Sequence, residues 1–316
     1  MMEERSMMQG RRNSIGKIIA KDLKSFGGAY LLAIPVIVYY ILFHYKPILG
    51  AVIAFKDFKP RLGIWGSKWV GFKYFASFFN SFYFARLLRN TLTISICGLL
   101  FTFPCAIVFA LMINEANNRI FKRTVQTISY MPHFISLVVV CSMITLFVDK
   151  DGFIVQLINL FNGNISQNLL NIPSAFVPIY ILSDIWQETG WNCIIYLAAL
   201  GAIDMELYEA ARIDGANRWQ QTIHVTIPGI TRTIMLLLIL RVGSIMSVGH
   251  EKIILLYNDY TMETADVISS YVYRRGLINA EYSFSTAVGL FNSVINFALV
   301  VLANFISNKT SGYGIW

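Results

Sequence analysis

The sequence has few charged residues and few histidines, and it lacks the residue clusters that enzymes use. Of its 316 residues, 14% are charged, compared with roughly 25% in soluble globular domains. The four histidines, His44, His133, His224 and His250, show neither metal-ligand spacing nor a nucleophile partner. No Walker-type phosphate-binding motif occurs. We therefore predict that the chain is not an enzyme and has no catalytic residue, metal site or cofactor of its own.

The cysteines and the basic residues form no compact cluster either. Cys97, Cys105, Cys141 and Cys193 fall inside or beside apolar segments without a CxxC pair, so we interpret them as packing residues. The net charge is +8, but the lysines and arginines lie in the connections between apolar runs. This distribution argues against nucleic-acid binding and predicts attraction to anionic membrane lipids.

Long apolar runs dominate the sequence instead. Hydrophobic residues make up 56% of the chain, and several runs reach the roughly 20 residues needed to cross a bilayer. They predict an all-α polytopic membrane protein with six transmembrane helices, at residues 28–50, 88–113, 127–148, 175–201, 230–249 and 284–306. Prolines and glycines inside these spans, such as Pro35, Pro104 and Gly243, predict a bent bundle with bends beside a cavity.

The same pattern divides the chain into three parts. A basic N-terminal segment at 1–27 precedes a six-helix membrane domain at 28–306, which contains a connecting loop at 203–229, and a tail follows at 307–316. The first apolar run contains Pro35 and no small-residue cleavage site, which indicates a retained helix rather than a signal peptide. Six spans put both termini on one side of the membrane. The lysines and arginines are almost evenly divided between the two sides, so the positive-inside rule does not settle which side that is.

Three long connections lie on the side opposite the termini. The first, from Phe55 to Arg89, mixes many aromatic residues with lysines and arginines, which favours an amphipathic helix at the membrane surface. The second, from Asp149 to Asn171, carries an apolar patch around 154–161. The third, from His250 to Tyr282, is either a partner-facing segment or a partly re-entrant one.

The loop between the fourth and fifth spans reads as two short helices. Asp204 is placed to cap the first helix, and Gly215 is placed to stop it. Asn217 and Gln220 have the spacing of a capping box for the second helix, which we expect Pro228 to end.

One face of the first short helix is made of small residues. Glu209-Ala210-Ala211 would let another protein approach closely, and Glu209, Arg212 and Asp214 would fix its register. Composition alone leaves two interpretations open, a partner-docking hairpin and an ordinary solvated loop.

This loop resembles the hallmark of a known family, the inner-membrane permeases of binding-protein-dependent ABC importers. Their pattern is EAA, three residues, G, about nine residues, I, two residues and P. The front part matches as Glu209-Ala210-Ala211 and Gly215, whereas the back part departs slightly, as Ile223, Ile227 and Pro228. Stretches 69–75 and 88–92 resemble sugar-type permeases of this family. Stretches 190–204, 266–268, 271–276 and 287–291 resemble its carbohydrate-uptake branch that handles oligosaccharides and polysaccharides, the LplB-type permeases.

The resemblance implies a fold, partners and a role for the loop. It implies a type I ABC importer permease in a bacterial cell membrane, with both termini cytoplasmic. It also implies a second permease subunit in a heterodimer, two ABC ATPase subunits that bind ATP and magnesium, and an extracytoplasmic solute-binding protein that delivers a carbohydrate. The loop would be the coupling helix against the ATPase, with the residues Glu209, Ala210, Ala211, Arg212, Asp214, Gly215 and Pro228.

Polar residues within the spans are candidates for the substrate path. Charged side chains there are costly and suggest function, and we hypothesise that Arg241 and Glu188 form an ion pair that lines or braces a cavity. A purely structural pair is an equal alternative. Sugar recognition needs amides and aromatic faces, which are offered by Trp186, Gln187, Trp191, Asn192, Asn292 and Asn296. Hydrogen bonding between helices would also explain these amides.

Other functions fit the sequence less well. An ABC permease for a non-sugar solute remains open. A secondary transporter would need its own ion-coupling groups and usually an inverted repeat, and neither is evident. A receptor or a channel is harder to exclude from composition.

Overall fold

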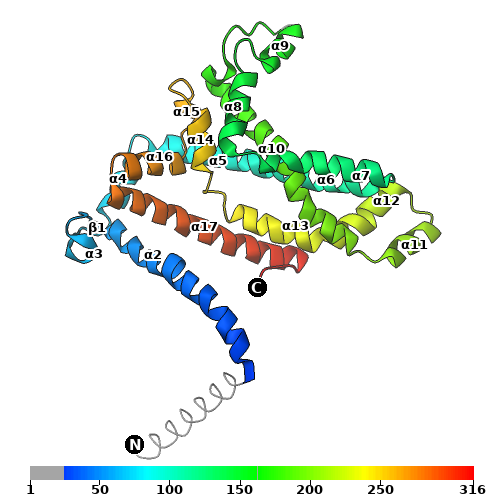
Figure 1. The fold of residues 1–316 in the computed structure, drawn as a ribbon, viewed down its shortest axis with the longest axis horizontal. Coiled ribbons are helices and arrows are strands. Elements are labelled where there is room, and N and C mark those ends of the chain that lie inside the picture. Colours follow the sequence, from blue (N-terminus) through cyan, green and yellow to red (C-terminus); the bar gives the residue numbers. More distant parts are fainter. Residues whose placement is uncertain (1–24, 162) are drawn as a thin grey trace, which may run out of the picture.

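The structure, a computed structural model, describes residues 25–161 and 163–316 and is almost entirely helical (Figure 1). The basic N-terminal segment expected at 1–27 therefore lies almost wholly outside the described residues. Among those described, four helices are long and apolar enough to cross a membrane: Ser25–Phe55, Phe84–Glu115, Arg218–Val242 and Tyr282–Ser311. A bent pair of helices makes a fifth if it counts as one span. The all-helical polytopic class is confirmed, and the number of six spans is not.

The third expected span, 127–148, is two helices rather than one. Helix α7 (Arg119–Tyr130) continues through the short 3-10 helix η4 (Met131–Phe134), and α8 (Leu137–Phe147) then leaves at an angle of 99°. Ile135 is extended, and the hydroxyl of Ser136 accepts a hydrogen bond from the Val139 amide at 3.4 Å, which starts α8 as a new helix. Pro132, at the start of η4, cannot donate to an α-helical ladder.

Helix α10 (Phe176–Gly201) corresponds to the fourth expected span and lies at the centre of the fold (Figure 1). It packs against α6 (Phe103–Glu115), α7 and α13 (Ile227–Val242). Its length suffices to cross a membrane, but Asp184 and Glu188 fall near its middle, so it is less apolar than the other long helices. Gly190 permits the closest approach, because a Cβ there would lie 2.0 Å from the carbonyl oxygen of Ser129 on α7.

The first connection is a compact arrangement of short elements instead of one amphipathic helix. Strands β1 (Lys56–Asp57) and β2 (Lys68–Trp69) pair antiparallel and flank α3 (Gly63–Gly66), and α4 (Lys73–Phe79) follows before α5 (Phe84–Cys97). Phe55 stacks on Trp69 with ring centroids 5.6 Å apart. Buried Phe78 meets Phe291 of α17 (Tyr282–Ser311) at 5.7 Å. The many aromatics of this segment thus close the end of the bundle.

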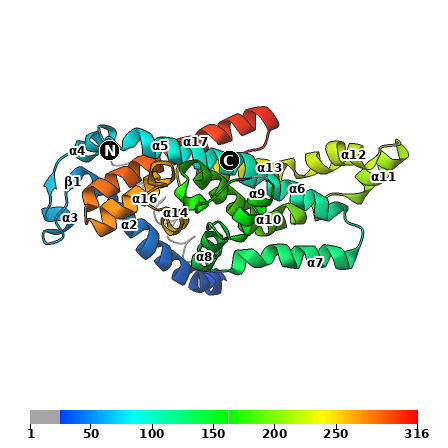
Figure 2. The same cartoon turned by 90° about the horizontal axis from the view of Figure 1, so that it is seen from above.

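The remaining connections are also short helices. Between α8 and α10 come α9 (Phe153–Leu160) and the 3-10 turns η5 (Leu169–Asn171) and η6 (Pro173–Ala175). Between α13 and α17 come α14 (His250–Leu256), α15 (Met262–Ala265), α16 (Ile268–Tyr273) and the π turn η8 (Arg274–Ile278). Figure 2 shows α14 and α16 on the side of the bundle where α4 and α5 also lie.

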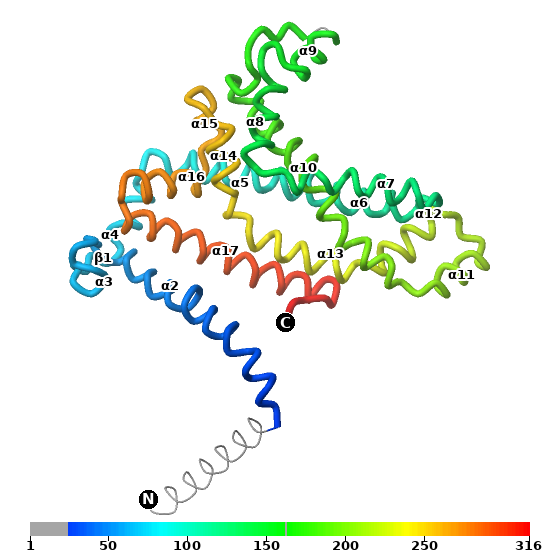
Figure 3. Tube along the Cα trace, viewed as in Figure 1, coloured from blue at the N-terminus to red at the C-terminus, as the bar shows by residue number. Residues whose placement is uncertain are grey.

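The two ends of the chain differ in how they pack. The helix Ser25–Phe55 packs on α17 through η2 (Leu49–Phe55), whereas its earlier part, with η1 (Ile41–Tyr45) and α2 (Lys46–Ile48), diverges from the bundle (Figure 3), and none of its most apolar window is buried. By contrast, α17 runs five residues further than the span expected at 284–306, and the tail folds back so that the Ile315 amide donates to Asn304 at 2.7 Å.

Candidate functional site

The loop between α10 and α13 forms the two helices that the sequence predicted. Helix α11 (Met205–Ile213) is capped by Asp204, whose carboxylate accepts a hydrogen bond from the Glu206 amide at 3.0 Å. Gly215 has a φ of +81° and ends it: the Gly215 amide donates to the Arg212 carbonyl at 3.0 Å, and the Ala216 amide to the Ala211 carbonyl at 2.9 Å. These two bonds make a Schellman motif, which requires the left-handed conformation that glycine adopts without strain.

The second short helix, α12 (Arg218–Gln221), begins with the predicted capping box. The Asn217 side chain accepts from the Gln220 amide at 2.9 Å, and the Gln220 side chain accepts from the Asn217 amide at 2.8 Å. The prediction that Pro228 ends this helix was wrong. A π turn, η7 (Thr222–Thr226), carries the chain directly into α13, so that Arg218–Val242 is one helical segment. Pro228 lies in the first turn of α13, where its missing N–H is least costly.

The surface of this loop is exposed and partly apolar. Glu209, Ala210, Arg212, Asp214, Gly215 and Pro228 are exposed, and Ala211 is half-buried. The apolar side chains of Ile213 and Trp219 are 87% and 72% exposed. Large apolar side chains at this exposure are typical of an interaction surface when they gather at one place.

The loop is attached firmly to the base of the fifth helix. The Tyr208 hydroxyl of α11 lies 3.0 Å from the hydroxyl of buried Thr226 in η7. The Gln221 side chain donates to the Ala216 carbonyl at 2.8 Å. A Cβ on Gly229 would meet the Ile203 side chain at 2.8 Å, so the two flanks of the loop touch there. These contacts join α11, α12 and the start of α13 into one packed unit.

The fifth helix stops seven residues before the predicted end of its span. Helix α13 ends at Val242, and residues 243–249, here called the helix break, form turns and irregular backbone before α14 begins at His250. Irregular backbone at membrane depth is tolerated only where protein or a water-filled cavity covers it. In transporters such interrupted helices mark the binding site.

Side chains from three helices satisfy the backbone of the helix break. Asn296 of α17 accepts from the Met246 amide at 3.0 Å, and Asn292 donates to the Met246 carbonyl at 2.9 Å. Ser95 of α5 donates to the Ile245 carbonyl, and Ser269 of α16 donates to the Val248 carbonyl at 2.5 Å. Asn292 and Asn296 thus make the hydrogen bonds between segments that the sequence left open as an alternative to substrate contact.

A cavity of about 490 Å³, here called the central cavity, lies beside the helix break. Its polar lining comes from three helical segments and the helix break, with Thr102 from η3 (Gly98–Thr102), Asp184, Glu188 and Asn192 from α10, Arg241 from α13, and Ser244 from the helix break. A smaller cavity of about 110 Å³ adjoins it and shares Asp184, Arg241 and Ser244. Of the candidates chosen from sequence, the structure therefore brings Glu188, Asn192 and Arg241 together.

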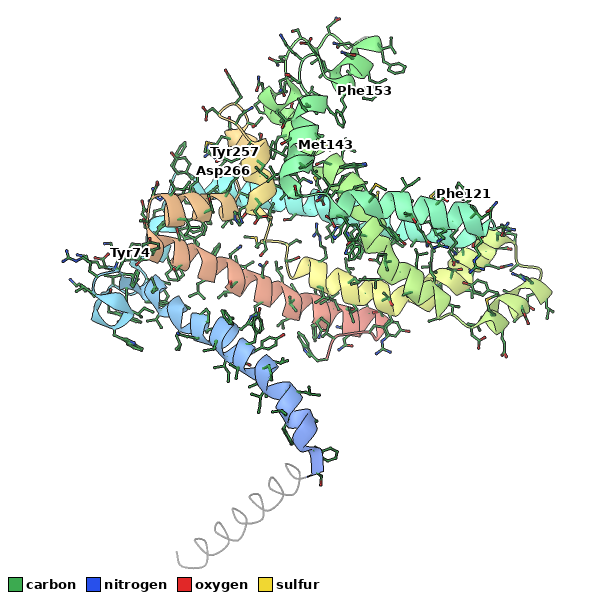
Figure 4. The ribbon with its side chains drawn as sticks, viewed as in Figure 1. Tyr74, Phe121, Met143, Phe153, Tyr257 and Asp266 are labelled. Atoms are coloured by element: carbon green, nitrogen blue, oxygen red, sulfur yellow. The ribbon has the colours of Figure 1, made fainter. Side chains whose placement is uncertain are left out.

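The predicted ion pair between Arg241 and Glu188 does not form. Glu188 instead lies 3.1 Å from Nδ1 of His133, which sits in η4 and stacks on Trp191 with ring centroids 4.5 Å apart. Because the third span breaks at η4, the imidazole reaches α10 from an element that sequence periodicity treated as a straight helix. Trp186 lies elsewhere and lines a separate apolar cavity together with residues such as Met143. Figure 4 labels Met143 on α8. Gln187 is buried.

Two clusters of charged residues were not predicted from the sequence. Lys252 of α14 is buried, lies 3.4 Å from the Asp184 carboxylate, and has its ammonium 4.7 Å from the Tyr180 ring centroid. Only the unexplained carboxylate of Asp184 inside an apolar run could have pointed to a cation partner. Nothing in the sequence identifies Lys252, 68 residues away, as that partner.

The second cluster surrounds Asp266, whose side chain is fully buried (Figure 4). Arg274 donates to both carboxylate oxygens at 2.9 and 2.6 Å, and Ser270 donates at 2.7 Å. Burial acts to lower the pKa of Arg274, but its hydrogen bonds to Asp266 and Tyr257 outweigh burial and raise that pKa. The Asn90 side chain also donates to the Asp266 carbonyl at 3.0 Å. The family-like stretches 88–92 and 266–268 are therefore packed together.

Comparison with known proteins identifies the family of this chain. A family model described as the binding-protein-dependent transport system inner membrane component matches residues 102–312. The chain belongs to this family. The resemblance seen in the sequence is confirmed.

Similar proteins match this permease over nearly its whole length. It is 44% identical over 288 residues to Protein LplB of Bacillus subtilis (strain 168), covering 91% of this chain and 90% of LplB. It is 43% identical over 287 residues to the polygalacturonan/rhamnogalacturonan transport system permease protein YteP of the same organism, covering 91% and 89%. A chain in the crystal structure of a bacterial alginate ABC transporter in complex with alginate pentasaccharide-bound periplasmic protein superposes with a TM-score of 0.85, at 42% identity, covering 93% and 99%.

These findings fix the class of the permease. It is a multi-pass inner-membrane component of an ABC importer and works in a complex with a binding protein and other transporter subunits. It is not itself an ATPase and carries no cofactor, because ATP is bound and hydrolysed by partner subunits.

Proposed function

We propose that this permease forms, with a second and different permease chain, the translocation path for an oligosaccharide released from a polysaccharide. The observation that carries this is the near full-length identity above 40% to proteins whose names specify alginate and polygalacturonan or rhamnogalacturonan. An importer of a non-sugar solute is the alternative, and no observation on the chain favours it.

The topology in this proposal has six spans with both termini in the cytoplasm. The fourth span is α10, whose carboxylates face the central cavity and not lipid. The third is the bent pair α7 and α8. The exposed apolar helix Ser25–Phe55 offers a surface that a partner permease could cover in place of lipid.

The loop 203–229 is, in this proposal, the coupling element against an ATPase subunit. Glu209, Ala210, Arg212, Asp214 and Gly215 lie at its exposed surface, and Ile213 and Trp219 add apolar area. Closure of two ATPase subunits on ATP would move this loop and switch the path between inward-open and outward-open states.

Two measurements test the proposal in the complete transporter reconstituted in proteoliposomes. ATP-dependent uptake of oligosaccharides derived from pectin and alginate should be observed, and a transporter that takes up no saccharide would refute the substrate class. Glu209→Lys should release the ATPase subunits during purification, whereas Leu207→Lys, which is exposed and lies about 160° from Glu209 around the axis of α11, should not. Retention of the ATPase by the Glu209→Lys complex would refute the coupling role.

A further inference from the structure

Arg241 is the cation of the central cavity that has no carboxylate partner in the part of the chain described. The other charged groups of the lining are matched, with Asp184 at 3.4 Å from Lys252 and Glu188 at 3.1 Å from His133. Between residues 25 and 316, apart from 162, no carboxylate oxygen lies within 4.0 Å of the Arg241 guanidinium. An arginine in a membrane domain is costly without a partner, so its free state calls for a ligand.

The position of Arg241 holds its guanidinium at the cavity. The residue lies in the last turn of α13, where the partial negative charge of the helix C-terminus favours a cation. Its Nη2 atom packs beside Gly98 of η3, only 3.1 Å from where a Cβ would stand, so the glycine leaves room for the guanidinium. The side chain is exposed and lines both the central cavity and the smaller one.

The two carboxylates of the cavity have partners on other elements. Lys252 comes from α14 and also lies over the Tyr180 ring, whereas His133 comes from η4 and is fixed by stacking on Trp191. Each carboxylate is therefore engaged by a cation or an N–H group from an element other than α13. An anionic group entering the cavity meets Arg241 as the group free to bind it.

We propose that Arg241 binds carboxylates of the passing substrate, and that the substrate is an oligosaccharide containing uronate residues. This inference rests on the proposed function of oligosaccharide transport. The planar guanidinium presents paired donors that match a carboxylate in bidentate geometry, whereas a neutral sugar offers only hydroxyl groups. The helix break beside Arg241 lets the substrate approach without a continuous helix in its way.

The test is uptake by the complete transporter, with its second permease, ATPase subunits and binding protein, in proteoliposomes. The probes are a galacturonate trisaccharide and a mannuronate trisaccharide, with maltotriose as the neutral comparison. Arg241→Gln should lower the initial rate of uptake of the preferred uronate trisaccharide by roughly tenfold or more, the size expected for one charge-assisted interaction. Uptake should fall in the order Arg, Lys, Gln, Glu at position 241, an electrostatic order that a packing role would not produce.

Arg232→Gln is the matched control, because Arg232 is exposed on the same helix and lines neither cavity. It should transport as the native protein does. If Arg241→Gln fails to assemble, Arg241→Lys keeps the charge and decides the outcome by an intermediate uptake rate. Native uptake of maltotriose but of neither uronate trisaccharide would overturn the inference and leave the proposed function standing. Uptake of uronate unchanged in Arg241→Gln would also overturn it, whereas uptake of no saccharide by the native transporter refutes the proposed function itself.

Discussion

Replacing Gly190 by alanine should separate α10 from α7 and destabilise the permease. The new Cβ would stand 2.0 Å from the carbonyl oxygen and 2.4 Å from the carbonyl carbon of Ser129. Both are backbone atoms, so no side-chain rotation can relieve the overlap and one helix must shift. Overpacking of this kind costs about 1–3 kcal/mol. The shift would also disturb the His133–Glu188 contact, because Glu188 lies two residues from Gly190.

The assay is thermal unfolding of the purified transporter in detergent, followed by tryptophan fluorescence. A loss of about 1–3 kcal/mol corresponds to a fall in melting temperature of roughly 2–12 °C. Gly201→Ala is the control, because it lies at the end of the same helix and a Cβ there meets nothing within 4 Å. It should be neutral or slightly stabilising, since alanine is the better helix former. A Gly190→Ala protein that melts with the native one would refute the close contact of α7 with α10.

Three further substitutions test other parts of the structure by the same unfolding assay. Gly215→Ala forces a φ of +81° on alanine and should cost about 1 kcal/mol, and an unchanged melting temperature would contradict the Schellman end of α11. Asn296→Leu leaves the buried Met246 amide unpaired and should cost about 1–3 kcal/mol, whereas Ser293→Ala on the exposed face of α17 should cost little. Asp266→Asn leaves Arg274 without its charge partner and should cost about 3–5 kcal/mol; a loss below 1 kcal/mol would show that the pair is solvated.

Local signals in the sequence predicted the geometry of the loop at 203–229 well. Asp204, Gly215 and the Asn217–Gln220 pair each act on backbone groups within a few residues, so their pattern determines the geometry without help from the rest of the fold. Pro228 was misjudged for the same local reason. A proline can begin a helix as well as end one, and only the π turn before it shows that the chain continues.

The breaks within the spans were harder to predict, because hydropathy does not indicate whether an apolar segment forms one helix or two. Residues 127–148 and 230–249 are apolar whether or not the backbone is helical, so apolar periodicity placed one span over each of them. Gly243 predicted a bend in the second span, where the helix break begins, but no residue was singled out for a bend in the first. The helix break depends on Asn292, Asn296, Ser95 and Ser269, which satisfy its backbone from distant parts of the chain. The predicted pairing of Glu188 with Arg241 was wrong for a similar reason. His133 reaches Glu188 only because the third span is broken.

The continuity of Arg218–Val242 gives the proposed coupling a physical route. At 1.5 Å per residue, these 25 residues form a rod of about 38 Å, which carries α12 at one end and Arg241 at the other. The Tyr208–Thr226 contact ties α11 to the rod, so a displacement of the loop moves Arg241 along with it. The rod ends at the helix break, where hydrogen bonds from α5, α16 and α17 hold the next segment. A displacement of the loop would therefore flex the helix break beside the central cavity. A switch between inward-open and outward-open states requires movement at this cavity.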